Sequence, residues 1–129
     1  MIVVDTNIIS YLLLPTPCQQ AAEALFQEDT VWASPLLWRS EMRNVLALYL
    51  RKELISLDQE KQIQDRAEVR MRGWEYQVPS DSVLTLAAVS GCSAYDCEFV
   101  ALAQDLGVPL VTMDRALRRA FPHITKALS

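Results

Sequence analysis

Residues 1–7 read MIVVDTN, an apolar run that is cut off by a carboxylate, a hydroxyl and an amide. A short apolar run of this kind predicts a buried strand over residues 2–4 that ends at Asp5. Two further runs, residues 31–33 and 108–112, are equally apolar, and the second is soon followed by Asp114. Strands that are apolar throughout are typical of parallel sheets that helices cover on both faces.

Helical segments alternate with these strands. Turn, capping and proline signals predict helices over residues 8–14, 19–27, 35–52, 58–72, 80–91, 93–106 and 114–121, with a further strand over 74–78. Ser34 and Pro35 have the pattern of a helix start, and Ser93 and Asp96 that of a capping box. We therefore expect an α/β fold, a three-layer α/β/α sandwich with a central, mostly parallel sheet, and a single domain over residues 1–129.

The composition excludes several classes of protein. The chain has 129 residues, of which 51% are hydrophobic and 22% charged, as in one globular domain. Three cysteines and one histidine provide neither a disulfide framework nor a zinc site. No signal peptide and no apolar run of bilayer length is present, so we expect a cytoplasmic protein without a membrane segment. The net charge of −4 argues against binding nucleic acid by overall attraction.

Two aspartates follow predicted strands. Asp5 comes directly after residues 2–4, and Asp114 follows residues 108–112. The carboxyl ends of parallel strands share one edge of a sheet, which is where sites form in such folds. The simpler interpretation is that each aspartate caps the helix that comes after it.

Two more acids lie on the apolar sides of predicted helices. On a helical wheel Glu41 falls about 40° from Leu37, between Leu48 and Val45, whereas Arg39 and Arg43 fall outside that arc. A carboxylate on a buried face needs a cation, a proton or a hydrogen-bond network, although an arginine partner or a place at the rim of the core would also satisfy Glu41. Asp96 lies on the same side as Phe99 and Val100, with Glu98 on the solvent side, although helix capping alone would explain Asp96.

A shared site explains all four acids at once. Carboxylates at close range repel one another unless a cation or protons compensate their charge. Oxygen ligands of high negative charge suit Mg²⁺ or Mn²⁺, which act on phosphates and can activate a water molecule. The pattern therefore predicts hydrolysis of phosphodiester bonds by a metal-activated water, with Asp5, Glu41, Asp96 and Asp114 as the catalytic and metal-binding residues.

The same residues resemble a known family. Asp5-Thr6-Asn7 after an N-terminal strand, Glu41 within residues 38–46, Tyr95-Asp96 before residues 99–103, and Asp114 within residues 111–115 are similar to the PIN domain, above all to VapC-type toxins. The resemblance covers nearly the whole chain in the right order. It implies a Mg²⁺- or Mn²⁺-dependent endoribonuclease, an antitoxin protein as partner and a homodimer. It matches Asp5, Glu41 and Asp96 to the three core acids and Asp114 to a fourth, less constant one.

Several polar residues are candidates for supporting roles. In the resemblance Thr6, Asn7 and Thr112 match positions that support the acids, although turn and cap chemistry would also explain them. Arg115, Arg118 and Arg119 are candidates for contact with RNA, whereas a solvated charged face is the simpler interpretation. The three tryptophans are expected in the core or at an interface rather than against nucleobases. The alternative function is a non-catalytic PIN-fold module that acts through a partner protein.

Overall fold

A parallel sheet of five strands runs through the molecule, and the computed structural model describes residues 1–129. The strand order is β3-β2-β1-β4-β5, and all four pairings are parallel. The strands are β1 (Ile2–Val4), β2 (Trp32–Pro35), β3 (Glu75–Tyr76), β4 (Leu110–Val111) and β5 (Thr125–Lys126). The first strand of the chain is thus the middle strand of the sheet, and the carboxyl ends of β1 and β4 lie next to each other.

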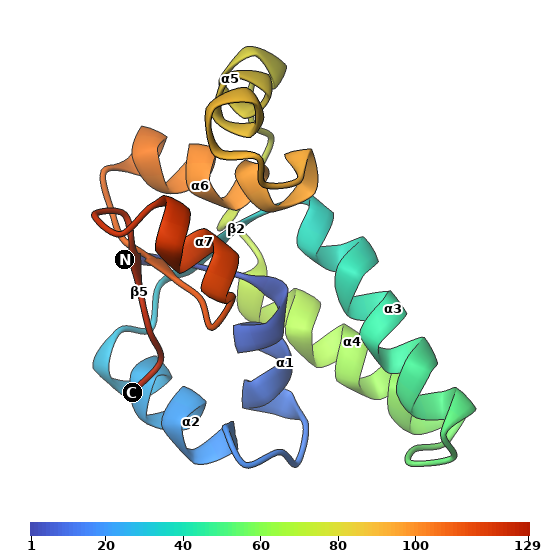
Figure 1. Cartoon of the computed structure of the whole chain (residues 1–129). Coiled ribbons are helices and arrows are strands. Elements are labelled where there is room, and N and C mark those ends of the chain that lie inside the picture. Colours follow the sequence, from blue (N-terminus) through green and yellow to red (C-terminus); the bar gives the residue numbers. More distant parts are fainter.

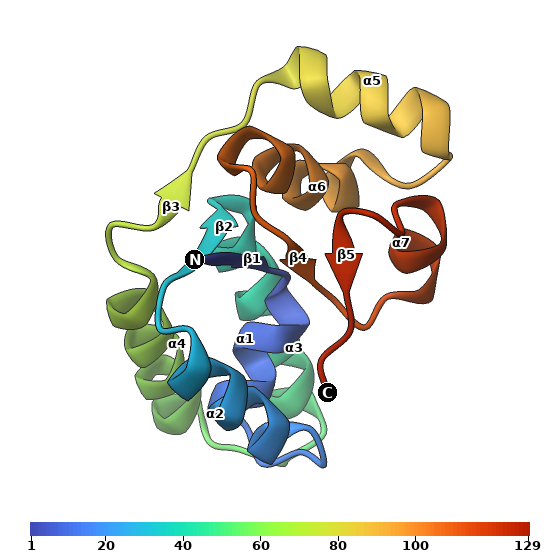
Figure 2. The same ribbon diagram turned by 90° about the vertical axis from the view of Figure 1, so that its left-hand side faces the viewer.

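Helices cover both faces of this sheet, as Figures 1 and 2 show. On one side lie α1 (Thr6–Leu13), α2 (Gln19–Glu28), α3 (Leu37–Arg51) and α4 (Leu57–Met71), and on the other lie α5 (Ser80–Ser90) and α6 (Ala94–Leu106). The short helix α7 (Arg115–Ala120) lies beside β5. The predicted three-layer sandwich is confirmed, and its sheet is parallel throughout.

Local signals in the sequence explain where most helices begin and end. The Asp5 carboxylate accepts a hydrogen bond from the Ile8 N–H at 3.2 Å and so caps α1. Ser93 caps α6 by accepting from the Asp96 N–H at 3.0 Å, and Gly107 ends that helix with a φ of 65°, which favours glycine. Of the predicted capping box at Ser93 only this half forms. A complete capping box is found instead at the start of α4, between Ser56 and Gln59.

The predicted helix start at Ser34 and Pro35 is wrong. Both residues belong to β2, and the helix begins at Leu37. The Ser34 hydroxyl donates to the Val4 carbonyl at 2.5 Å, so it ties β2 to β1 and caps nothing. The N–H groups of Ser34 and Leu36 donate to β3 and its flank, and Pro35 lies past the end of the pairing with β1. A proline is therefore tolerated in this strand because no partner needs its missing N–H.

The C-terminal strands also differ from expectation. The predicted strand over residues 108–112 narrows to Leu110–Val111, because the Val108 N–H donates to Ala103 and closes the end of α6. The short strand β5 was not predicted from the sequence. Its two residues pair with β4 at the edge of the sheet, where too few residues take part to leave an alternating pattern.

A polar cluster joins α3 to the opposite edge of the sheet. Arg39 donates to both carboxylate oxygens of Glu75 on β3 and to Glu68 on α4, at distances of 2.5 to 2.9 Å. The Trp38 indole N–H donates to the same Glu75 carboxylate at 2.8 Å. Arg39 was expected on the solvent side of its helix, but these contacts hold it between α4 and β3. Arginine is suited to this position because its planar fork can bind a carboxylate with two hydrogen bonds.

The core lies between the sheet and the two layers of helices. Trp32 and Trp38 are buried in it and Trp74 packs against it, as expected for the tryptophans. No single helix is long and apolar enough to cross a membrane, and only α5 and α6 taken together, across a bend of 114°, reach that length and composition.

Replacing Arg39 with methionine tests the polar cluster. Arg39→Met leaves the largely buried Glu75 carboxylate with the Trp38 indole as its remaining donor, so we expect the unfolding free energy to fall by about 2 kcal/mol. The loss is smaller than for a fully buried pair because the Arg39 side chain is 35% exposed. Urea unfolding measures it, with Arg43→Met as the control, since Arg43 lies on the same helix, is exposed and forms no ion pair. Equal losses in both variants would contradict this role.

Candidate active site

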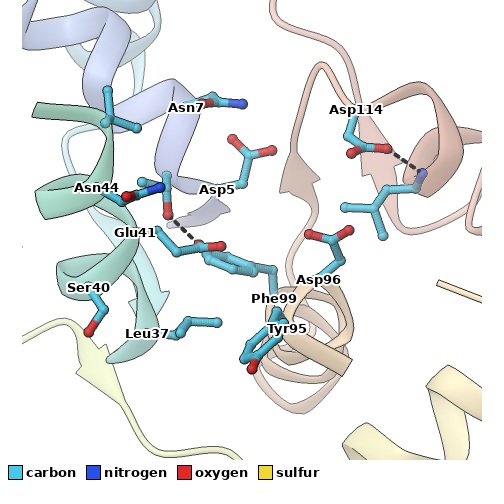
Figure 3. Close-up of a pocket in the computed structure, with 13 residues that line it drawn as sticks. Asp5, Asn7, Leu37, Ser40, Glu41, Asn44, Tyr95, Asp96, Phe99 and Asp114 are labelled. Carbon is cyan, nitrogen blue, oxygen red and sulfur yellow. Dashed lines mark hydrogen bonds between the residues drawn. The ribbon is translucent and has the colours of Figure 1, made fainter. Parts of the chain in front are cut away.

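All four predicted acids line one cavity of about 420 Å³. It opens at the carboxyl ends of β1 and β4, between α1, α3, α6 and the start of α7 (Figure 3). The lining residues are Asp5, Thr6, Asn7, Leu37, Ser40, Glu41, Asn44, Val45, Tyr95, Asp96, Phe99, Asp114 and Leu117. No histidine, cysteine, lysine or arginine is among them, so the polar chemistry of the cavity is that of carboxylates, hydroxyls and amides.

Asp5 and Asp114 are both helix caps and cavity residues. Each uses its Oδ1 atom to accept from an N–H of the helix that follows, Asp5 from Ile8 at 3.2 Å and Asp114 from Leu117 at 3.0 Å. The two interpretations of these residues are therefore compatible. Capping fixes each carboxylate at a strand end, and the second oxygen and the remaining lone pairs stay available for other partners.

Glu41 reaches the cavity from α3, on the face predicted by the helical wheel. The helical wheel placed the centre of the buried face near Leu37 and Leu48, which is slightly wrong. The fully buried residues of α3 are Trp38, Met42 and Leu46, whereas Leu48 is 42% exposed. Glu41 lies at the border of that core-facing side and is half-buried. Its partner is a hydroxyl, since the Thr6 side chain donates to Glu41 Oε1 at 2.7 Å. The alternative of an arginine partner is excluded.

Asp96 enters the cavity from the first turn of α6 and is half-buried. Figure 3 shows its carboxylate across the cavity from Glu41, with Asp5 and Asp114 nearby. Glu98, two residues further on, was expected on the solvent side but is half-buried as well. Burial, and then the nearby Glu41 charge, raise the pKa of Glu98.

Thr6 and Thr112 donate hydrogen bonds to the acids, whereas the Asn7 side chain does not. The Thr112 hydroxyl donates to Asp5 Oδ2 and accepts from the Asp114 N–H at 3.0 Å, so one side chain joins the ends of β1 and β4. Thr6 holds Glu41 in the same way. Asn7 is exposed at the cavity and its side chain makes no hydrogen bond within the protein.

The four acids repel one another around the cavity. The pKa of Asp5 is raised to about 6 as the net result of several causes: burial raises it most, hydrogen bonds from Thr112 and the Ile8 N–H lower it, and the Asp114 and Glu41 charges raise it. Burial and then the Asp96 charge raise the pKa of Glu41. Burial and then the Asp114 charge raise that of Asp96. Each acid therefore lies near two of the others, and together they form a closed ring of negative charge.

The donor atoms of this ring fit a hard divalent cation. Mg²⁺ and Mn²⁺ prefer oxygen ligands such as carboxylates, and four carboxylates line the cavity. The ligand types therefore suit such an ion, whereas no group of three or more His, Cys, Asp or Glu side chains is arranged so that it could hold one.

The predicted RNA-contacting arginines lie outside the cavity. Arg115, Arg118 and Arg119 are exposed on α7, the helix that Asp114 caps. None of them lines the cavity with the acids. Arg119 lines a different, shallower pocket beside the end of α5, and Arg39 contributes no free positive charge because it is paired with Glu75 and Glu68.

Several cavity residues were not singled out from the sequence. Asn44 lies three residues after Glu41 and four after Ser40 on α3, and this helical spacing could have identified both Asn44 and Ser40. Leu37, Val45, Phe99 and Leu117 looked like ordinary core positions in the sequence. Only the arrangement of α3, α6 and α7 around the cavity shows that their side chains line it.

Comparisons with known proteins agree on one family. The family model described as PIN domain matches residues 2–121. Ribonuclease VapC3 of Pyrobaculum aerophilum is 28% identical over 133 residues, which cover 95% of this chain and 96% of the relative.

Solved structures share the fold. PAE2754 of the same organism superposes with a TM-score of 0.77 at 20% identity, over 98% of this chain and 82% of the other. FitAB bound to an IR36 DNA fragment gives 0.73 at 20% identity, over 98% and 94% of the two chains. A toxin–antitoxin complex from Klebsiella pneumoniae gives 0.69 at 16% identity, over 100% and 97%.

The raised pKa of Asp5 predicts how stability depends on pH without metal. The folded pKa of about 6 exceeds the ordinary value of 3.8, so the fold binds this proton more tightly than the unfolded chain does. The resulting stability is fully present below pH 3.8 and is lost as the pH rises through about 6. We expect Asp5 to account for a fall of about 3 kcal/mol in the unfolding free energy between pH 4 and 7.

Urea unfolding in EDTA across this pH range measures that fall. Asp5→Asn removes the titrating group and should flatten the profile, whatever its effect on absolute stability. Asp105→Asn, at an exposed position of α6, serves as the control and should keep the slope of the wild type. A profile that is equally steep in Asp5→Asn would contradict the assignment.

Proposed function

Because the chain belongs to the PIN domain family, we propose that it is a metal-dependent endoribonuclease and the toxin of a type II toxin–antitoxin pair. The observation that carries this proposal is the ring of four carboxylates around one cavity whose lining contains no histidine, cysteine, lysine or arginine. The name of the relative, ribonuclease VapC3, supports RNA as the substrate. Residues 1–129 then form a single nuclease domain.

In this proposal Asp5, Glu41, Asp96 and Asp114 hold Mg²⁺ or Mn²⁺. A bound ion of this kind stabilises negative charge on the phosphate and lowers the pKa of a water that attacks it. The protein keeps the ligands in place. Thr112 and the Ile8 N–H fix the two oxygens of Asp5, and Thr6 fixes Oε1 of Glu41. Such hydrogen bonds orient ligands that would otherwise turn away from one another.

A protein partner belongs to the same proposal. One structural neighbour is a toxin–antitoxin complex, and another is FitAB bound to DNA. By analogy, a cognate antitoxin would bind this chain and cover the acidic cavity, and the chain would act as a homodimer. The exposed arginines Arg115, Arg118 and Arg119 are proposed to contact the RNA backbone from α7.

The second candidate function is a non-catalytic PIN-fold module that acts through its partner. The exposed and half-buried acids would then serve as a docking surface for a basic segment. Metal-dependent cleavage distinguishes the two functions, because only the first requires it.

Cleavage of RNA is the direct test. The purified chain in Mn²⁺ is expected to cleave total cellular RNA, and EDTA should abolish the cleavage. Asp96→Asn should reduce it by at least about 100-fold, because removing one charged group that stabilises the reaction costs this much in other enzymes. Asp105→Asn, in the same helix, should cleave like the wild type. Absence of cleavage in the folded wild type, with the partner absent, would favour the non-catalytic module.

Metal binding is tested separately by thermal unfolding. Millimolar Mg²⁺ or Mn²⁺ should raise the melting temperature of the wild type by several degrees, because a ligand at about 100 times its Kd stabilises by about 2.7 kcal/mol. Asp96→Asn should lose most of this rise. In EDTA it should melt no lower than the wild type, since one source of repulsion is gone. A large loss of stability in EDTA would mean that Asp96 serves the fold instead.

A further inference from the structure

Five apolar or aromatic side chains line the acidic cavity. Leu37 and Val45 come from α3, Tyr95 and Phe99 from α6, and Leu117 from α7. Figure 3 shows Leu37 and Tyr95 pointing toward each other from their two helices, on the side away from Asn7 and Asp114, and these two side chains form an apolar wall. Metal ligands do not need such a wall. It offers a surface for a flat, apolar part of a bound molecule, directly beside Asp96.

Tyr95 differs from every other aromatic residue of the chain. The sequence contains three Trp, four Tyr and three Phe, and all except Tyr95 belong to the core or pack against it. Tyr95 is 65% exposed, and its hydroxyl makes no hydrogen bond within the protein. Its ring therefore contributes little to the fold, and it stands at the mouth of the cavity next to the acidic ring.

A nucleobase matches this position in chemistry and in connectivity. Stacking of a base on an aromatic ring contributes about 1–3 kcal/mol and does not depend on opposite charges. That matters here, because a protein of net charge −4 gains little from overall attraction to a polyanion. A base is also linked through one ribose to the phosphate beside it, so a base on Tyr95 brings that phosphate to the carboxylates.

We propose that Tyr95, with Leu37 facing it, binds the base of an unpaired nucleotide next to the scissile phosphate. The inference rests on the proposed nuclease function and adds the two residues that would bind a base beside the acids. In a duplex both faces of a base are covered by its neighbours, and a base must leave the stack to reach such a pocket. The site therefore takes single-stranded RNA or loops, and it does not act within a continuous duplex.

Kinetics with one RNA in two forms test the proposal. An unstructured oligonucleotide is compared with the same cleavage sequence placed inside a base-paired stem. The wild type should cleave only the unstructured oligonucleotide. Tyr95→Ala should raise the KM for that oligonucleotide by about 5- to 150-fold, the equivalent of about 1–3 kcal/mol, with a smaller change in kcat. Tyr95→Phe keeps the ring and should retain most of the affinity. Leu84→Ala on α5 is the control, since Leu84 is 63% exposed and lies outside the cavity.

An abasic nucleotide beside the cleavage position makes the test specific to the base. The abasic substrate should have a KM with the wild type that is raised as much as Tyr95→Ala raises the KM of the intact RNA. Combining the abasic substrate with Tyr95→Ala should raise KM no more than either change alone. Additive losses, or an unchanged KM in Tyr95→Ala, would overturn the proposal while leaving the nuclease function intact.

Binding separates this proposal from the nuclease function. The affinity of Asp96→Asn for the unstructured RNA in Mg²⁺, with and without Tyr95→Ala, is measured by fluorescence anisotropy. If the wild type does not cleave, a Tyr95-dependent affinity still supports the base site, and no dependence overturns it. If Tyr95→Ala weakens a basic partner peptide and leaves RNA binding unchanged, the wall is a protein-docking surface and the base site is excluded.

Discussion

Repulsion among carboxylates is the constraint on which the rest of this structure depends. Asp5, Glu41, Asp96 and Asp114 come from four different parts of the chain, and the charges of Asp114, Glu41 and Asp96 raise the pKa values of neighbouring acids. A fold that was selected for stability alone would keep such groups apart or pair them with cations. Here the cations of the chain are placed elsewhere: Arg39 is bound by Glu75 and Glu68, and the arginines of α7 point to solvent. The hydroxyl groups of Thr6 and Thr112 donate hydrogen bonds to Glu41 and Asp5, so they hold these carboxylates in place against their repulsion without neutralising them.

The sequence was sufficient to predict most of the fold and the acids of the candidate site. Strand ends identified Asp5 and Asp114, because the character of a strand and its end are local properties of a few residues. The helical period placed Glu41 and Asp96 on inward faces for the same reason. The predictions about Pro35, Arg39, Glu98 and β5 were wrong or missing, and each of these depends on contacts with residues far along the chain. Whether Pro35 starts a helix or ends a strand is decided by β3, some forty residues later.

An acidic protein can still bind RNA if its basic residues lie apart from its acidic cavity, and here the exposed arginines of α7 are not in the lining. The cavity contains only negative and neutral polar groups, so a phosphate can enter it only together with a cation. The acids and the apolar residues of the lining come from the same helices, since α3 provides both Glu41 and Leu37, and α6 provides both Asp96 and Tyr95.

The hydroxyl of Thr112 joins two residues that are far apart in synthesis. Its partner Asp5 lies 107 positions earlier, and the strand that precedes Thr112 completes the sheet on one side of β1. Until residues 110–114 have left the ribosome, β1 has an open edge and the acidic ring lacks Asp114. A nascent or truncated chain therefore contains the first three acids but not the assembled cavity. During translation the acidic cavity is thus completed only after residues 110–114 have been synthesised, long after Asp5, Glu41 and Asp96.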